Sequence, residues 1–225
     1  MFDITIYGHL FNDTIYDGQL ETMALGGIAN CWKALNDIDA NLSIGLSPTA
    51  LCEANIYIER THSKRNSIPS FNLEVFEPRI KESKISHILY LNELPTVDFI
   101  ASLDGIISAD TCKGSEIKNP NVLQFIDYLF VADDDGQDID FLRKNVKGHV
   151  ILHSPTYSRV LRKATDTKFD VPDKWILKNV NVLGAGDFFA SSFLYAIHKG
   201  WTLEGAVQAA HCTTSDLIRK YNEEV

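Results

Sequence analysis

The sequence predicts an α/β fold built on a largely parallel β-sheet. Compact apolar runs, each ending in polar residues, recur through the middle of the chain: "ISHILYL", "GIISAD", "YLFVAD" and "GHVILH". Strands that are apolar on both faces are typical of parallel sheets, which helices cover on each side. The segments between these runs, among them "NPNVLQFID" and "DIDFLRKN", have the length of crossover helices. The polar residues that end the strands, Asp110 and 133–135, are either site residues or solvated loop acids.

Length and composition bound the class of protein. With 225 residues and 45 % hydrophobic content, the chain can bury one core, so we expect a single domain over 1–225. A net charge of -9 argues against a nucleic-acid partner. The sequence contains no leader and no apolar stretch approaching the ~18 residues of a membrane span, which predicts a cytoplasmic protein without a membrane partner. The four cysteines are widely spaced and form no metal motif, so they should be reduced.

The N-terminal part should form a strand, a hairpin and a helix. "DITIY" is a buried strand that ends at Gly8, and Asp17-Gly18 is a hairpin turn. "GGIANCWKALNDI" has helical apolar spacing. Trp32 in this helix is either a core residue or a ring that stacks on a ligand. Residues 41–80 contain short strand-like runs that suit a small antiparallel element.

The C-terminal quarter should contain two strands and two helices. "KFDVP" and "ILKNVNVL" are strand-like, and a helix is expected over residues 184–199 with a stop at Gly200. The second helix should begin after the N-cap Thr202.

A glycine-rich turn joins this last strand-like run to the first of the two helices. The turn contains Gly184, Ala185 and Gly186, followed by Asp187. Backbone N–H groups at such a turn converge at a helix N-terminus and form an anion site. A dinucleotide fingerprint would need Gly or Ala where Phe189 stands, and the chain has no Gly-Lys-Ser/Thr of a P-loop. The open alternative is a tight turn whose Asp caps the helix.

"GAGDFF", followed by two helices, resembles the second signature of the ribokinase-like (phosphofructokinase B type) carbohydrate kinase family. The resemblance implies a shortened, divergent member with a three-layer α/β/α sandwich, a mostly parallel sheet and a small β lid within 14–23 and 54–76. It also implies an ATP-dependent kinase that uses Mg²⁺ and phosphorylates a sugar or nucleoside hydroxyl. Gly184, Ala185 and Gly186 would form the anion hole, and Asp187 would be the catalytic base.

Other segments extend this resemblance. "YGHLFND" is similar to the family's first strand, which implies that Asp13 binds substrate hydroxyls. "LGGIAN" resembles the substrate turn, which implies contacts from Gly26, Gly27 and Asn30. "FVADDDG" takes the place of an Asn-x-x-Glu motif near the metal, so the resemblance gives Asp135 an indirect metal role.

Departures from the family pattern keep a second function open. Where the family has a Thr-x-Gly-x-x-Gly nucleotide loop, this chain has "HSPTYS", with Pro155 in a glycine position. The alternative is therefore a catalytically impaired protein that binds a sugar or nucleotide without turnover. A dehydrogenase fails on the spacing of the glycine turn. Because the lid alone would be a small sheet of low stability, we expect a homodimer formed through the lid.

Overall fold

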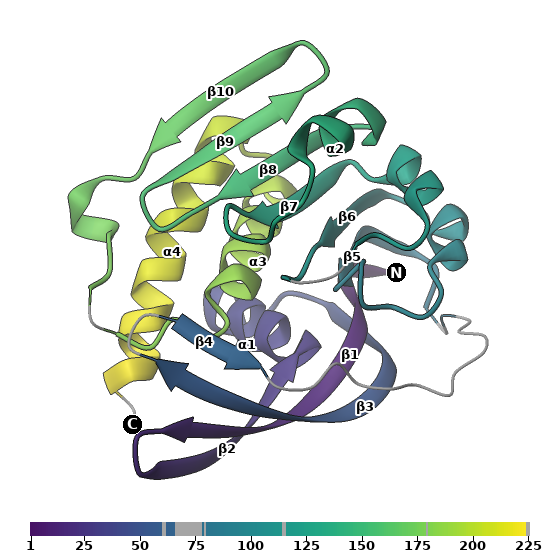
Figure 1. The fold of residues 1–225 in the computed structure, drawn as a ribbon. Helices are drawn as coiled ribbons and strands as arrows, with labels where there is room; N and C mark the ends of the chain where they lie inside the picture. The colour runs from purple at the N-terminus through teal and green to yellow at the C-terminus, as the bar shows by residue number, and fades with distance from the viewer. Residues whose placement is uncertain (60–61, 66–77, 79, 114–115, 179, 224–225) are drawn as a thin grey trace.

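The structure is a computed structural model in which residues 1–59, 62–65, 78, 80–113, 116–178 and 180–223 are described. Their strands form one ten-stranded sheet in the order β10-β9-β8-β7-β6-β5-β1-β3-β4, and β2 pairs with β1 beside this path. The pairings along β8-β7-β6-β5-β1-β3 are all parallel. The α/β fold with a mostly parallel sheet is confirmed (Figure 1).

The elements have the following bounds. The strands are β1 (Phe2–Asp17), β2 (Leu20–Gly27), β3 (Ile44–Glu59), β4 (His62–Arg65), β5 (Ser83–Leu89), β6 (Ile106–Asp110), β7 (Tyr128–Ala132), β8 (His149–His153), β9 (Tyr157–Arg162) and β10 (Thr165–Asp170). The α-helices are α1 (Ile28–Ile38), α2 (Ile139–Asn145), α3 (Ala185–His198) and α4 (Leu203–Glu223). Short 3₁₀ helices are η1 (Asp98–Ser102), η2 (Pro120–Phe125) and η3 (Asp173–Trp175).

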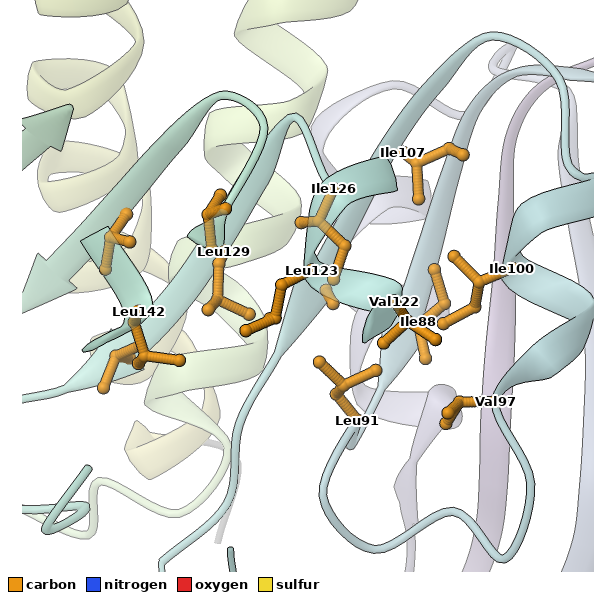
Figure 2. Packing of buried hydrophobic residues seen from close by; sticks show 14 of the residues in the cluster. Ile88, Leu91, Val97, Ile100, Ile107, Val122, Leu123, Ile126, Leu129 and Leu142 are labelled. Carbon is orange, nitrogen blue, oxygen red and sulfur yellow. The ribbon is translucent and has the colours of Figure 1, made fainter. Parts of the chain in front are cut away.

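Side chains that alternate along each strand build two cores, one on each face of the sheet. In β7, Phe130 belongs to the core with α1, α3 and α4, whereas its neighbours Leu129 and Val131 belong to the core with η1, η2 and α2. Figure 2 shows this second core, where Ile100, Leu123 and Leu142 gather with residues of the strands. The α1, α3 and α4 side is the more helical layer, because the crossovers on the other side are mostly 3₁₀ turns (Figure 1).

The predicted lid is made from strands that also run through the main sheet. β1 and β3 pair in parallel from Ile4 to Tyr16, and β2 folds back on β1 through the Asp17-Gly18 turn, as expected. Residues 41–80 were expected to hold short antiparallel runs, but β3 is one strand of 16 residues. It continues past Pro48 because the register shifts at Gly8 and His9 and leaves Thr49 unpaired in the ladder. Residues 60–61 and 66–76 of the predicted lid lie outside the described residues.

The two C-terminal helices confirm the predicted pattern of caps and stops. Thr202 accepts a hydrogen bond from Gly205 N–H through its side chain at 3.2 Å, and Gly200 adopts a left-handed φ of 80° after α3. The predicted strand over "ILKNVNVL" is wrong, because the described residues from 176 to 183 are irregular. Trp32 is 44 % exposed and is not a core residue.

None of the helices in the described part of the chain combines the length and the apolar composition that crossing a bilayer requires. The four cysteines are free thiols, as their spacing predicted.

Candidate active site

The glycine-rich turn forms the N-terminus of α3 and is held in one conformation. Gly184 has a left-handed φ of 79°, which glycine adopts without steric cost. Ala185 N–H donates to the Val182 carbonyl at 3.0 Å, and the first helical hydrogen bond runs from Phe188 N–H to the Gly184 carbonyl at 2.9 Å. The amides of Gly186 and Asp187 therefore lie in the first helical turn, where the helix dipole is positive.

The loop that precedes the turn is anchored to the end of α4 instead of to a strand. Asn181 N–H donates to Asn222 Oδ1 at 2.9 Å, and Asn222 Nδ2 donates to the Asn181 carbonyl at 2.9 Å. Asn181 Oδ1 also accepts from Leu183 N–H at 2.9 Å. These side-chain bonds replace the ladder that a strand would have supplied, and they fix the approach to Gly184.

Asp187 lies buried at the centre of the site, with hydrogen-bond donors on both of its carboxylate oxygens. Its exposed fraction is 3 %. Asn30 Nδ2, from the first turn of α1, donates to Oδ2 at 2.7 Å, and the Tyr90 hydroxyl, from the residue after β5, donates to Oδ1 at 2.9 Å. Three elements that are far apart in sequence therefore meet at this carboxylate.

The other residues predicted to contact substrate also come together. Asp13 is buried on β1, and a Cβ placed on Gly26 would overlap its carboxylate oxygen Oδ2. Gly27 has a left-handed φ of 62° and lies against the backbone of His9, so the chain turns there directly into α1 and Asn30. Asp13 thus lies against Gly26, and Asn30 is hydrogen-bonded to Asp187. The Gly26-Gly27 turn connects these two contacts along the chain.

Two further carboxylates lie at the ends of neighbouring strands. Asp110 ends β6 with 3 % exposure, and Asp135 follows β7 with 8 % exposure. Asp135 Oδ2 accepts from the Thr111 hydroxyl at 2.8 Å and from Ala132 N–H at 3.2 Å. Burial raises the pKa of both carboxyl groups, and the negative charge of Asp187 raises the pKa of Asp110 further. Asp110 and Asp135 are therefore buried at the carboxyl edge of the sheet, whereas Asp134 is exposed and pairs with Lys113.

Carboxylates at this edge of the sheet are potential ligands for a metal ion. Across the described residues, no three His, Cys, Asp or Glu side chains are grouped closely enough to hold a metal ion. Mg²⁺ in phosphoryl-transfer sites is usually held by one or two carboxylates together with phosphate oxygens of the substrate and water. Asp135 is buried at the carboxyl edge of the sheet, and its Oδ2 already accepts hydrogen bonds from Thr111 and Ala132.

The segment that stands in place of the family's nucleotide loop is a closed hairpin turn between β8 and β9. Ser154 Oγ accepts from Thr156 N–H at 3.3 Å and from Tyr157 N–H at 3.1 Å. The side chain of Ser154 therefore satisfies backbone donors that an open glycine loop would direct toward phosphate.

Two histidines lie against Phe189 beside the glycine turn. The His153 ring stacks on Phe189 with centroids 4.9 Å apart, and His211 from α4 meets the edge of the same ring at 4.9 Å. His211 Nε2 lies 2.7 Å from Ser158 Oγ. The pKa of His153 and that of His211 are lowered to about 4, mainly by burial, and the charge of His211 contributes to the shift at His153. Both imidazoles are therefore neutral at physiological pH.

The buried, neutral state of His211 predicts an acid-sensitive contribution to stability. The unfolded chain protonates this histidine near its ordinary pKa of 6.5, whereas the folded chain protonates it only at a pKa of about 4. The contribution is therefore present above pH 6.5 and is lost as the pH falls toward 4, on the order of 1–2 kcal/mol at pH 5. In urea unfolding at pH 7 and pH 5, His211→Gln should lose less stability than the parent on acidification. Equal losses in the two proteins would contradict a neutral buried His211.

Sequence reasoning missed Tyr90 as a member of the site. The residue follows an apolar strand, which is the same signal that identified Asp110, but an aromatic ring in such a run is more often a core residue. Its contact with Asp187 spans 97 residues and cannot be read from local spacing.

Comparisons with known proteins agree with the fold and with the C-terminal pattern. Residues 145–222 match the pfkB family of carbohydrate kinases. Ribokinase from Thermotoga maritima is similar in structure, with a TM-score of 0.71 and 18 % identity over 97 % of this chain and 93 % of that one. Adenosine kinase from Sinorhizobium meliloti has a TM-score of 0.68 and 15 % identity over 97 % and 94 % of the two chains.

A third similar structure is a pyrophosphate-dependent kinase of the ribokinase family, solved with a pyrophosphate analogue and myo-inositol. It has a TM-score of 0.64 and 15 % identity over 96 % of this chain and 95 % of that one. A sequence search of curated proteins finds no match. The sequence match to the pfkB family covers the C-terminal third of the chain, and the chain as a whole is similar in fold to ribokinase and to kinases of the ribokinase family.

Proposed function

We propose that this protein is a small-molecule kinase that transfers a phosphoryl group to a hydroxyl of a sugar or nucleoside. The observation that carries this proposal is the buried Asp187, which lies one residue beyond Gly186 and is hydrogen-bonded to Asn30. A carboxylate at this place is within reach of an acceptor hydroxyl, while the adjacent helix N-terminus stabilises the negative charge of the moving group. Phosphoryl transfer needs positioning and electrostatic stabilisation more than covalent help.

The chemical step assigns one task to each part of the site. Asp187 accepts the proton of the acceptor hydroxyl as the acceptor oxygen forms a bond to phosphorus, and the bond from phosphorus to the donor's leaving oxygen breaks. The Gly184 to Gly186 turn provides the anion hole at the positive end of α3. Asp13, Gly26, Gly27 and Asn30 bind hydroxyls of the acceptor. Mg²⁺, for which Asp135 is the candidate ligand, would neutralise charge on the donor phosphates.

ATP is the proposed donor, and inorganic pyrophosphate is the second candidate. The family resemblance favours ATP. The closed hairpin at 153–158 favours a donor that needs fewer contacts, and one similar structure is that of a pyrophosphate-dependent kinase.

Thermal shifts with each donor separate these cases. A ligand that binds only the folded state at 100 times its Kd stabilises it by about 2.7 kcal/mol, so millimolar Mg²⁺-ATP should raise the Tm clearly. Mg²⁺-ADP serves as the product control, and Mg²⁺ alone serves as the blank. A shift with pyrophosphate and none with either nucleotide would indicate that pyrophosphate, and not ATP, is the donor.

The alternative function is binding of a sugar or nucleotide without turnover. The hairpin that replaces the nucleotide loop is the observation in its favour. A protein that shifts with a sugar or nucleotide, yet forms no phosphorylated product with either donor, would have this function.

Two further expectations stay predictions. One is a cytoplasmic location. The other is a homodimer through the lid segments of residues 14–23 and 54–76, within which Tyr16 and Tyr57 stack with centroids 4.9 Å apart. Sedimentation that shows a monomer at high concentration would remove the dimer.

A further inference from the structure

Tyr90 and Asn30 contact different carboxylate oxygens of the proposed base. Its hydroxyl donates to Asp187 Oδ1 at 2.9 Å, whereas Asn30 Nδ2 donates to Oδ2 at 2.7 Å. One donor on each oxygen fixes the rotation of the carboxylate plane as well as its position. A carboxylate fixed in this way presents its remaining lone pairs in defined directions.

The backbone around Tyr90 is itself held firmly. The Tyr90 carbonyl accepts from Glu93 N–H at 2.9 Å and from Leu94 N–H at 3.2 Å, and Leu91 N–H donates to the Asp110 carbonyl at 2.8 Å. The segment after β5 is thus a closed turn joined to the end of β6. The ring packs against the core that contains Phe193 and α1, so the hydroxyl reaches Asp187 from a rigid base.

The charges around Tyr90 keep it in the form that donates a hydrogen bond. Burial raises the pKa of Tyr90 well above its ordinary value, and the negative charges of Asp187 and Asp110 raise it further. The phenol therefore keeps its proton at physiological pH. Tyr90 acts as a hydrogen-bond donor here and does not exchange protons with substrate.

We propose that Tyr90 is a positioning residue for phosphoryl transfer, which holds Oδ1 of Asp187 so that the carboxylate meets the acceptor hydroxyl in one orientation. This role rests on the phosphoryl transfer proposed above. It deepens that function by naming the residue that orients the base. Misplacement of a reacting group by about 1 Å costs up to about 10²-fold in rate, so an oriented base matters for kcat more than for binding.

The test is the Tyr90→Phe variant, which keeps the ring and removes only the hydroxyl. We expect kcat to fall about tenfold while KM changes less than twofold, because the acceptor contacts of Asp13 and Gly26 remain. The acidic limb of the kcat profile should also move to higher pH, because the charged form of the base loses a donor. Among the described residues, Tyr90, Asp110 and Cys31 are titratable groups that interact electrostatically with this carboxylate.

Tyr195→Phe is the matched control. Tyr195 belongs to the same core, and its hydroxyl donates to Asp39 Oδ2 at 3.3 Å, away from Asp187. This variant loses a comparable phenol-to-carboxylate bond and should keep the kcat and the pH profile of the parent.

A second readout does not depend on turnover. The ¹³Cζ NMR resonance of Tyr90, assigned by its loss in Tyr90→Phe, should move on Asp187→Asn and stay in place on Asp216→Asn. If the chemical shift of this resonance does not change on Asp187→Asn, the contact is overturned, and the role of Tyr90 with it.

The kinetics of the Tyr90→Phe variant also test the positioning role. An active parent whose Tyr90→Phe variant keeps the same kcat and pH profile overturns the positioning role. A lower KM at unchanged kcat also overturns it, because the hydroxyl would then compete with the acceptor. A parent without turnover overturns the proposed function and the role in transfer together, while the NMR readout still decides the contact.

Discussion

Asp187→Asn should lower kcat by about 10²- to 10⁴-fold and leave acceptor binding close to that of the parent. The loss has the size expected for removal of a general base. The introduced amide can still form hydrogen bonds with Tyr90 and Asn30, so the site should keep its shape. The amide cannot, however, take up the proton of the acceptor hydroxyl. Turnover is measured with saturating donor, and acceptor binding by calorimetry.

Asp216→Asn is the control for this substitution. Asp216 lies exposed on α4 and pairs with Arg219 at 3.3 Å, so its charge has no part in the proposed step. An Asp187→Asn protein that turns over at a rate near that of the parent would mean that another group accepts the proton.

Gly8→Ala should cost the fold about 3 kcal/mol or more. Gly8 lies in β1 between β3 and β5, and a Cβ there would overlap the carbonyl oxygen of Leu89. Backbone on both sides is fixed by parallel ladders, so relief requires movement of a central strand, and the φ of 153° adds strain for a residue with a side chain. Urea unfolding measures the loss.

Gly18→Ala is the control that separates the steric overlap of a new Cβ from the strain of a non-glycine residue at a positive φ. Gly18 also has a positive φ, of 63°, but no atom lies within 4 Å of a Cβ placed there. Its substitution should cost only about 1–2 kcal/mol. Equal losses at the two positions would contradict the close approach of β1 and the end of β5.

Local patterns in the sequence predicted the parts of the fold that depend on local physics. The parallel strands followed from uniformly apolar runs, and the caps at Thr202 and Gly200 followed from residue type. The strand expected over 176–183 is absent from the described residues of that segment, where Asn181 forms hydrogen bonds with Asn222 on α4. β3 is longer than predicted because a bulge allows the strand to continue past Pro48.

The residues of the candidate site are likewise of two kinds, those that lie within a local motif and those that only the fold brings together. Asp187, Asn30 and the Gly26-Gly27 turn lie within short motifs, and the resemblance of these motifs to those of a known family is what singled the residues out. Tyr90 lies outside any motif, and only the folding of β5 against the start of α3 brings it to Asp187. The state of Asp110 likewise depends on burial among carboxylates that are distant in sequence.

The most direct test of the proposed function is ³¹P NMR of the parent protein with a panel of sugars and nucleosides, Mg²⁺, and either ATP or pyrophosphate. Phosphoryl transfer to a hydroxyl predicts a new phosphomonoester resonance that needs both donor and acceptor and is absent with Asp187→Asn. If no phosphomonoester forms from any acceptor, although donor and acceptor both bind the folded protein, the kinase function is contradicted.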